Sequence, residues 1–148
     1  MQHISPSNRL QLTFGSLEDP VATDDPARFL DAFVEKLDIA KLGFLIKSLQ
    51  VEGRPSSHPK LFLKIYLYGY QNGIRSSRRF EKECKRNVEI QWLCGSLVPN
   101  YRSIADFRKV NGKPLINMFK LFVSFLKEMD LIGGKTIAID ETETHSPP

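Results

Sequence analysis

The sequence has little of what stabilises secreted proteins or anchors membrane proteins. Its 148 residues include only two cysteines, Cys84 and Cys94, which form no Cys-x-x-Cys pair and cannot build a disulfide framework. We expect both to be small buried residues. No apolar run is long enough to span a membrane, and the N-terminus lacks the basic-then-apolar pattern of a signal peptide. These absences favour a compact protein in a reducing, cytoplasmic setting.

Side-chain groupings that are typical of enzymes are also scarce. His3, His58 and His145 lie far apart, with no Cys or carboxylate at metal-ligand spacing, which argues against a zinc site. There is no Gly-rich phosphate loop and no Ser-His-Asp order that resembles a catalytic triad. Asp140 is the exception, because it follows an apolar, β-prone segment and could present a metal ligand at the end of a strand. On spacing alone, an Asp that merely ends a strand is the favoured interpretation.

Positive charge, in contrast, is abundant in the middle of the chain. Residues 54–113 contain 13 Lys and Arg against 4 Asp and Glu, a balance of +9. The remaining residues contain 8 against 13, a balance of −5, and the two sums give the net charge of +4. A basic segment between acidic flanks is typical of proteins that bind a polyanion. Nucleic acid is the first candidate partner and a membrane surface the second.

Helical spacing predicts an all-α bundle of short helices. Asp25 followed by Pro26 is typical of a helix start, and a second helix is predicted to open at Asp38. That second helix would place four apolar side chains on one face: Leu42, Leu45, Ile46 and Leu49. A long helix is predicted over residues 114–130, and residues 136–140 predict one terminal strand. We therefore expect a flexible arm over residues 1–23, a helical domain over 24–131 and the stub of a further domain over 132–148.

A helix-turn-helix-like unit is predicted near the middle of the chain. Its first helix would start at Pro59 and end at Gly73, because glycine easily takes the positive φ of a helix end. Gly69 inside this helix is expected to cost about 1 kcal/mol relative to alanine. Ser76 or Ser77 would cap the second helix. The alternative interpretation is an ordinary bundle with a basic, solvated helix face.

Two further helix starts are predicted after this unit. Asn87 can cap a short helix, and Ser103 with Asp106 resembles a capping box in which Asp replaces the usual Glu. Most aromatic side chains of this region are expected in the core, with Tyr70 and Tyr101 as exceptions. The residues expected in the core are Tyr66, Tyr68, Phe80 and Trp92.

Basic and hydroxyl side chains gather at the two predicted helix starts near Ser77 and Ser103. Arginine can meet a guanine edge or a phosphate with two hydrogen bonds, and a helix start can hold a phosphate. Glu81 and Glu83, which lie among the cations, are expected to form weak surface pairs. The two helix starts compete, so the sequence does not decide which helix would enter a groove. The candidate DNA-binding residues are Arg75, Ser76, Ser77, Arg78, Arg79, Lys82, Lys85, Arg86, Arg102, Arg108 and Lys109.

Several stretches resemble the InsH-type N-terminal domain of bacterial insertion-sequence transposases. The most specific are Asn-Gly-Ile-Arg-Ser-Ser-Arg-Arg at residues 72–79 and Ile-Ala-Asp-Phe-Arg at residues 104–108, and the likeness extends over residues 29–140. The resemblance implies a helical domain that binds the terminal inverted repeats of a mobile element. In the full-length family, this domain precedes a ribonuclease-H-like domain that uses Mg²⁺ at an Asp-Asp-Glu site.

The resemblance also implies a role for Asp140. Ile139-Asp140 matches the first strand of that catalytic domain, so Asp140 would be its first metal ligand. The match then fails, because Glu141 stands where Gly is expected and Glu143 where a basic residue is expected. The second Asp and the Glu of the site are not in this sequence. We therefore expect a truncated transposase in which Asp140 is a remnant, with no cofactor and no catalysis by this chain alone.

The expected partner is double-stranded DNA at the ends of the element, and no membrane. Two other functions stay open. A second chain could complete an active, metal-dependent DNA transposase that includes Asp140. Alternatively, the chain could be a helical regulator that pairs with itself or with a full-length transposase through Phe119, Phe122 and Leu126.

Overall fold

A computed structural model describes residues 3–45 and 58–129 of the chain. Within these ranges it contains six helices and no strand, which confirms the predicted all-α bundle of short helices. The helices are α1 (Pro26–Glu35), α2 (Pro59–Asn72), α3 (Ser77–Arg86), α4 (Val88–Cys94), α5 (Tyr101–Val110) and α6 (Gly112–Glu128). The predicted strand at residues 136–140 and the predicted stub of a further domain lie outside the described residues.

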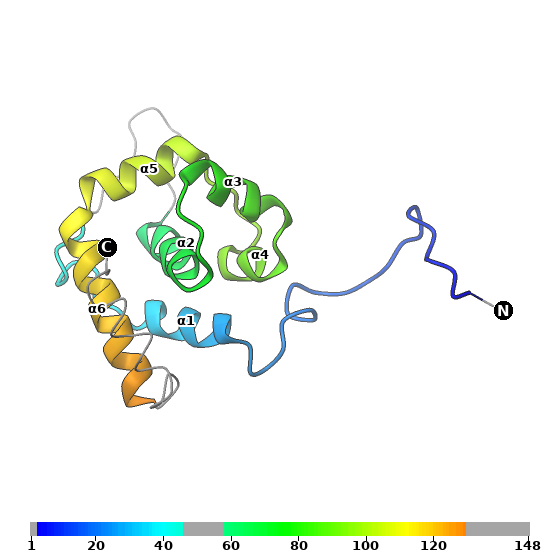
Figure 1. The fold of residues 1–148 in the computed structure, drawn as a ribbon, viewed down its shortest axis with the longest axis horizontal. Coiled ribbons are helices and arrows are strands. Elements are labelled where there is room, and N and C mark those ends of the chain that lie inside the picture. Colours follow the sequence, from blue (N-terminus) through cyan, green and yellow to red (C-terminus); the bar gives the residue numbers. More distant parts are fainter. Residues whose placement is uncertain (1–2, 46–57, 130–148) are drawn as a thin grey trace.

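α2 lies at the centre of the bundle and supplies much of its core. Figure 1 shows the other helices arranged around it. Leu63, Ile65 and Leu67 are fully buried. Other residues of α2 are nearly so: Leu61, Phe62, Tyr66 and Tyr68. A helix that is apolar on nearly all sides is stable only when it is surrounded, which explains why every residue of 61–68 except Lys64 is apolar.

Polar side chains of α2 also connect it to its neighbours. The hydroxyl of Tyr66 donates to the backbone oxygen of Ile104 in α5, and that of Tyr68 donates to the carboxylate of Glu89 in α4. Burial raises the pKa of both tyrosines to about 12, so both hydroxyls keep the proton they donate at neutral pH. Lys64 Nζ lies 2.7 and 2.8 Å from two carboxylates of α1. The central helix is therefore fixed relative to three neighbours.

Gly69 allows α3 to approach α2 closely. A Cβ built at this position would lie 2.3 Å from Cζ of Phe80 and 2.7 Å from the backbone oxygen of Ile74. Phe80 is fully buried against this gap. The glycine that appeared from the sequence to be only a local cost to helix stability is therefore required where the two helices meet.

Most of the predicted helix boundaries are confirmed. Asp25 caps α1, Ser76 caps α3 through a 3.0 Å bond from the N–H of Arg79, and Asn87 caps α4. α2 ends at Gly73, whose φ of 73° lies in the left-handed region. The capping box predicted at Ser103 is wrong, because the cap of α5 is Asn100, three residues earlier, which accepts the N–H of Ser103 at 2.8 Å.

The helix predicted to open at Asp38 does not form in the described residues. Residues 39–43 make a single turn, and Gly43 then takes a φ of 96°, which no right-handed helix can continue through. The N–H of Leu45 instead donates to Oδ1 of Asn111, at 2.8 Å. The left-handed conformation of Gly43 and the bond to Asn111 thus outweigh the helical spacing of the apolar residues. The rest of the predicted helix, from residue 46 on, lies outside the described residues.

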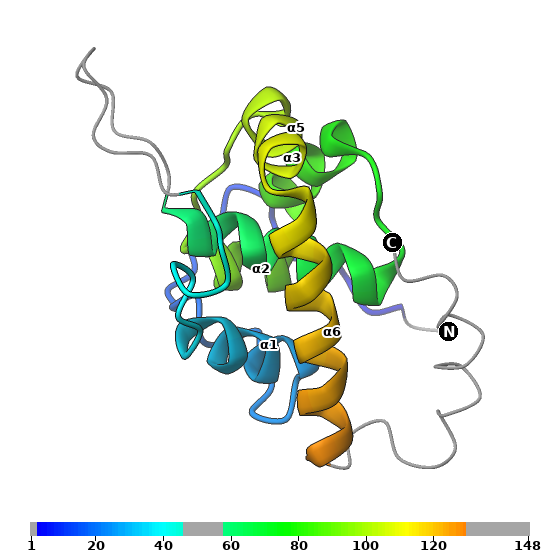
Figure 2. The ribbon, with the colours of Figure 1, turned by 90° about the vertical axis from the view of Figure 1, so that its left-hand side faces the viewer.

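α6 closes one side of the bundle. Figure 2 shows it running from the level of α5 to the level of α1. Its Phe122 is fully buried and packs edge-on against Phe33 of α1, with ring centroids 5.0 Å apart. Phe119 is also buried, so neither ring offers the exposed surface that the dimer alternative needs. Within the described ranges, no helix has both the length and the apolar character to cross a bilayer.

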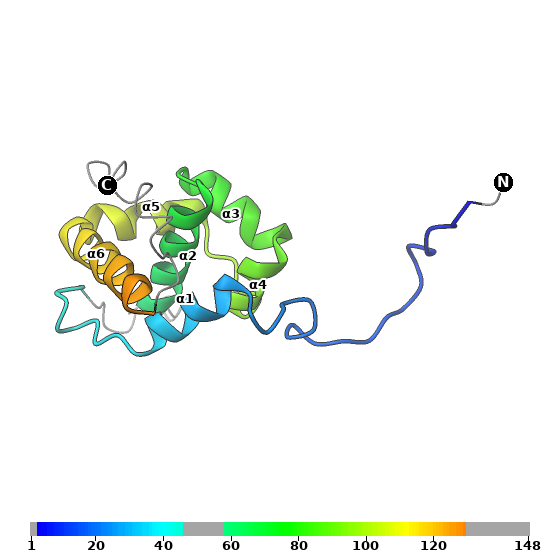
Figure 3. The same cartoon turned by 60° about the horizontal axis from the view of Figure 1, so that its bottom comes forward.

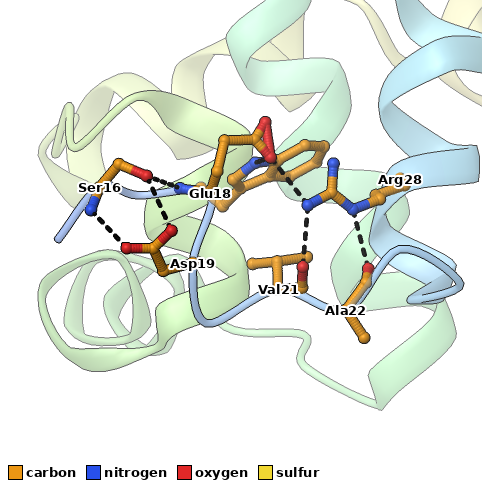
Figure 4. A network of polar contacts seen from close by, with 7 residues as sticks. Ser16, Glu18, Asp19, Val21, Ala22 and Arg28 are labelled. Atoms are coloured by element: carbon orange, nitrogen blue, oxygen red, sulfur yellow. Dashed lines mark hydrogen bonds and ion pairs between the residues drawn. The ribbon is translucent and has the colours of Figure 1, made fainter.

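The segment before α1 is held to the bundle by Arg28. Its guanidinium donates to the backbone oxygens of Val21 and Ala22, each at 2.8 Å, and contacts Glu18 at 2.7 Å (Figure 4). The guanidinium carbon also lies 4.9 Å from the ring centroid of Trp92, whose indole N–H donates to Glu18. Trp92 is thus half-buried at the surface rather than in the deep core.

Residues before this attachment extend away from the helices. Figures 1 and 3 show this N-terminal stretch leaving the bundle on the side of α4. Its large apolar side chains are exposed: Ile4, Leu10, Leu12 and Phe14. Val21, in contrast, is buried beside Arg28, so contact with the bundle begins before residue 23. The arm and domain boundaries expected from the sequence stay predictions.

Candidate nucleic-acid interface

Most of the predicted DNA-binding cations lie on two helices that pack against each other. α3 and α5 are neighbours, and they lie side by side at the top of Figure 1. Every predicted DNA-binding cation is solvent-exposed. Those on α3 are Arg78, Arg79, Lys82, Lys85 and Arg86, and those on α5 are Arg102, Arg108 and Lys109. The two helix starts that seemed to compete in the sequence therefore contribute to one surface.

A shallow hollow of about 550 Å³ lies between the start of α3 and the first turns of α5. Four arginines, one tyrosine and one aspartate define its chemistry: Arg75, Arg78, Arg102, Arg108, Tyr101 and Asp106. Ser76 and Ser77 line the side formed by the start of α3. Formal charges of four arginines and one aspartate sum to +3, so the hollow is suited to an anion.

Tyr101 holds two of the arginines at the hollow. The guanidinium carbon of Arg78 lies 4.0 Å from the Tyr101 ring centroid, and that of Arg102 lies 5.7 Å from it. Arg78 also donates to the Tyr101 hydroxyl at 3.1 Å. The negative face of an aromatic ring attracts cations, so one ring attracts two arginines that line the same hollow.

The arginines of the hollow form no ion pair with any carboxylate in the described part of the chain. Among the described residues, no ion pair within 4.0 Å involves Arg75, Arg78, Arg102 or Arg108. Asp106 lines the same hollow and forms no such pair either. These cations keep their hydrogen-bonding groups largely for solvent or for a ligand.

Tyr101 is itself fixed by the start of α5. Its backbone N–H donates to Oε1 of Glu81 at 2.9 Å, which joins the first residue of α5 to α3. Asn100 caps the same helix. Both contacts fix the backbone at the start of α5, and the Tyr101 hydroxyl accepts from Arg78.

Three other cations of α3 lie close to glutamates. Arg86 lies 2.8 Å from Glu83, Arg79 lies 4.0 Å from the same carboxylate, and Lys85 lies 3.6 Å from Glu81. Glu83 is only 6% exposed, so the expectation of a weak surface pair is wrong for this residue. Hydrogen bonds from Arg86 and then from Asn87 hold the pKa of Glu83 below its ordinary value. The carboxylate therefore stays ionised and compensates nearby positive charge.

The structure thus divides the predicted DNA-binding residues into two groups. Those that line the hollow are Arg75, Ser76, Ser77, Arg78, Arg102 and Arg108. Those that lie outside it are Arg79, Lys82, Lys85, Arg86 and Lys109. Tyr101 and Asp106 belong to the hollow although neither was among the predicted binding residues. Recognising Asn100 as the cap would have placed Tyr101 and Arg102 in the first turn of α5, although not their contact with α3.

The remaining predicted site residue cannot be placed. Asp140 lies outside the described residues. Within residues 3–45 and 58–129, no group of three or more His, Cys, Asp or Glu gathers in a way that could hold a metal ion. Cys84 and Cys94 are both buried and free, as expected for small core residues.

The fold and the surface together define an all-α domain whose basic side chains meet at the junction of two helices. The chain matches the family model described as transposase domain (DUF772) over residues 15–110, and it belongs to that family. The match begins beside Ser16, in the segment held by Arg28, and ends with α5. It thus includes the hollow entirely. Comparisons with the curated proteins and with the solved structures gave no match.

Proposed function

We propose that this chain binds double-stranded DNA through the basic surface of α3 and α5. In this role it is the module of an insertion-sequence transposase that recognises the terminal inverted repeats of the element. The single observation that supports the proposal most strongly is the hollow, which is lined by four arginines from the turn before α3, from α3 and from α5, none of them in an ion pair among the described residues.

DNA suits this surface because the phosphate backbone is a regular array of negative charges. The cations of α3 and α5 extend beyond the hollow along both helices, so several phosphates could be contacted at once. Membership of a transposase family supports the same partner, because a transposase must contact the ends of the DNA it moves. The proposal concerns binding, and it assigns no step to Asp140 or to Mg²⁺.

A binding titration tests the proposal. The full chain is titrated into a fluorescein-labelled duplex that carries the element end, and a scrambled duplex of equal length serves as the control. We expect sub-micromolar binding at low salt, preference for the element end, and a slope of log affinity against log salt that gains about −0.9 per phosphate contact. Absence of binding, or binding that salt does not weaken, would contradict the proposal.

A charge-matched pair of variants locates the surface. Arg78→Ala with Arg79→Ala removes two charges from α3, whereas Lys41→Ala with Lys120→Ala removes two exposed charges outside α3 and α5. We expect the first variant to bind about tenfold more weakly, with a shallower salt slope, and the second to bind within about twofold of the wild type. Equal losses would place the DNA on another surface.

A further inference from the structure

The arrangement around Tyr101 is more specific than a basic surface needs to be. Two guanidinium groups stand over one ring, 4.0 and 5.7 Å from its centroid, although like charges repel each other. Among the described residues, neither guanidinium has a carboxylate within 4.0 Å to offset that repulsion. An anion in the hollow that both arginines line would lower this repulsion, so the arrangement is suited to binding an anion.

On this basis, and resting on the proposed function, we propose that the hollow receives one phosphate of the DNA backbone, shared by Arg78 and Arg102. One N–H of Arg78 is already given to the Tyr101 hydroxyl. A guanidinium has five N–H donors, so the others remain for phosphate oxygens. Tyr101 is then a positioning residue, which orients the two arginines without touching the phosphate.

The start of α3 adds donors to the same hollow. Ser76 and Ser77 line it, and the first backbone bond of the helix runs from the N–H of Phe80 to the oxygen of Ser76. The N–H groups of Ser77 and Arg78 therefore precede the hydrogen-bonded turns of the helix. They supplement the arginines, which supply the charge.

A substitution at Asp106 tests the proposal, because a bound phosphate and a bound base edge predict opposite changes in affinity. The Asp106 carboxylate lines the hollow and forms no ion pair with any described residue, so it would repel a phosphate held there. If the hollow instead received a base edge, the same carboxylate could accept a hydrogen bond from a cytosine amino group. Asp106→Asn should therefore strengthen binding of a phosphate and weaken binding of a base edge.

The experiment measures the affinity of the full chain for the element-end duplex. We expect Asp106→Asn to bind about threefold more tightly than the wild type, because one repulsive charge is removed. The control Asp24→Asn makes the same charge change just before α1, which lies across α2 from α5 in Figure 1, and should bind within about 1.5-fold of the wild type. Weaker binding by Asp106→Asn would overturn the proposal and indicate a base edge in the hollow. An equal gain in affinity for Asp106→Asn and Asp24→Asn would overturn it as well, because the gain would then come from the net charge of the chain.

The salt slope tests whether a single phosphate is shared. Arg78→Ala with Arg102→Ala removes two charges, but the slope should change by about 0.9 if both contact one phosphate and by about 1.8 if each contacts its own. A change near the larger value, or no change, would overturn the proposal. If the wild type itself does not bind DNA, the proposed function fails together with this inference, whereas normal wild-type binding with an unaffected double variant removes the inference alone.

Two substitutions at Tyr101 test its positioning role. Tyr101→Leu removes the ring without changing charge, and we expect about threefold weaker binding because the arginines lose their common support. Tyr101→Phe keeps the ring and should stay within about twofold of the wild type. Circular dichroism checks that both variants retain the fold. Equal affinity of the leucine variant and the wild type would show that the ring does not position the arginines.

Discussion

The two ends of α3 carry similar cations in different surroundings. At its start, Arg78 stacks on Tyr101 beside Arg102, with no carboxylate within 4.0 Å among the described residues. Towards its end, Lys85 and Arg86 lie within 3.6 and 2.8 Å of glutamates. A count of basic residues treats these ends as equal. The comparison shows that the charge a surface offers to a ligand depends on which cations are already compensated.

This difference has an energetic consequence for any anion that approaches. At the end of α3, a phosphate must compete with carboxylates that already hold Arg86 and Lys85. At the hollow it meets cations whose mutual repulsion it relieves. We therefore expect the start of α3 to supply most of the DNA affinity, and the following predictions test that expectation.

The largest expected effect comes from disturbing the contact between Gly69 of α2 and Phe80 of α3. Gly69→Ala would place Cβ 2.3 Å from the Phe80 ring and 2.7 Å from the backbone oxygen of Ile74, so both the buried ring and the turn before α3 must shift. We expect the free energy of unfolding, measured by urea denaturation, to fall by about 2–3 kcal/mol. Gly112→Ala is the control, because a Cβ there meets nothing within 4 Å. Equal stability of the two variants would contradict the close approach of α2 and α3.

Removing the charge of Glu83 should release two cations of α3 from their ion pairs. In Glu83→Gln, Arg79 and Arg86 lose their charged partner but keep a hydrogen-bond acceptor. We expect the free energy of unfolding to fall by about 1–2 kcal/mol. The DNA affinity should rise by about twofold in the same titration, since two cations are released. Unchanged affinity would show that pairing is not what limits this end of the helix.

The pH dependence of stability tests the same carboxylate. The pKa of Glu83 lies below its ordinary value of 4.5, because Arg86 and Asn87 donate to the ionised form. Its stabilising contribution is therefore complete above pH 4.5 and is lost as the pH falls through the lowered pKa. The difference in unfolding free energy between wild type and Glu83→Gln should be constant from pH 7 to about 5 and shrink below that. A difference that shrinks between pH 7 and 5 would mean that Glu83 is not stabilised as an anion.

The smallest expected effect concerns Glu81, which contacts both Lys85 towards the end of α3 and Tyr101 beside its start. Glu81 pairs with Lys85 at 3.6 Å and accepts the backbone N–H of Tyr101 at 2.9 Å. Glu81→Gln keeps an acceptor for Tyr101, so stability should change by no more than about 0.5 kcal/mol. Glu81→Ala removes the acceptor as well and should weaken DNA binding, measured by anisotropy, by about twofold. Identical affinities of the two variants would show that this bond does not position Tyr101.

Much of the fold was predictable because helix boundaries depend on local chemistry. Asp25, Ser76 and Asn87 cap the helices they were expected to cap, and α2 ends at Gly73. In each case, the side chain or backbone conformation that ends the helix belongs to residues only a few positions away. The family resemblance is confirmed by the match to the transposase domain family.

The failures come from contacts between residues distant in sequence. The helix expected at Asp38 is replaced by a turn whose exit bonds to Asn111, 66 residues further on. Glu83 looked like a surface residue because its neighbours are charged, yet the fold buries it. The hollow was only partly predictable, since its arginines were visible in the sequence while the meeting of α3 and α5 at Tyr101 was not.

The most direct test of the difference between the two ends of α3 is a charge-matched comparison of affinities. Arg78→Ala with Arg102→Ala and Lys85→Ala with Arg86→Ala each remove two exposed cations, and both are titrated against the element-end duplex at the same salt concentration. We expect the first variant to bind about tenfold more weakly than the wild type and the second about twofold more weakly. Equal losses, or a larger loss in the second variant, would contradict the account.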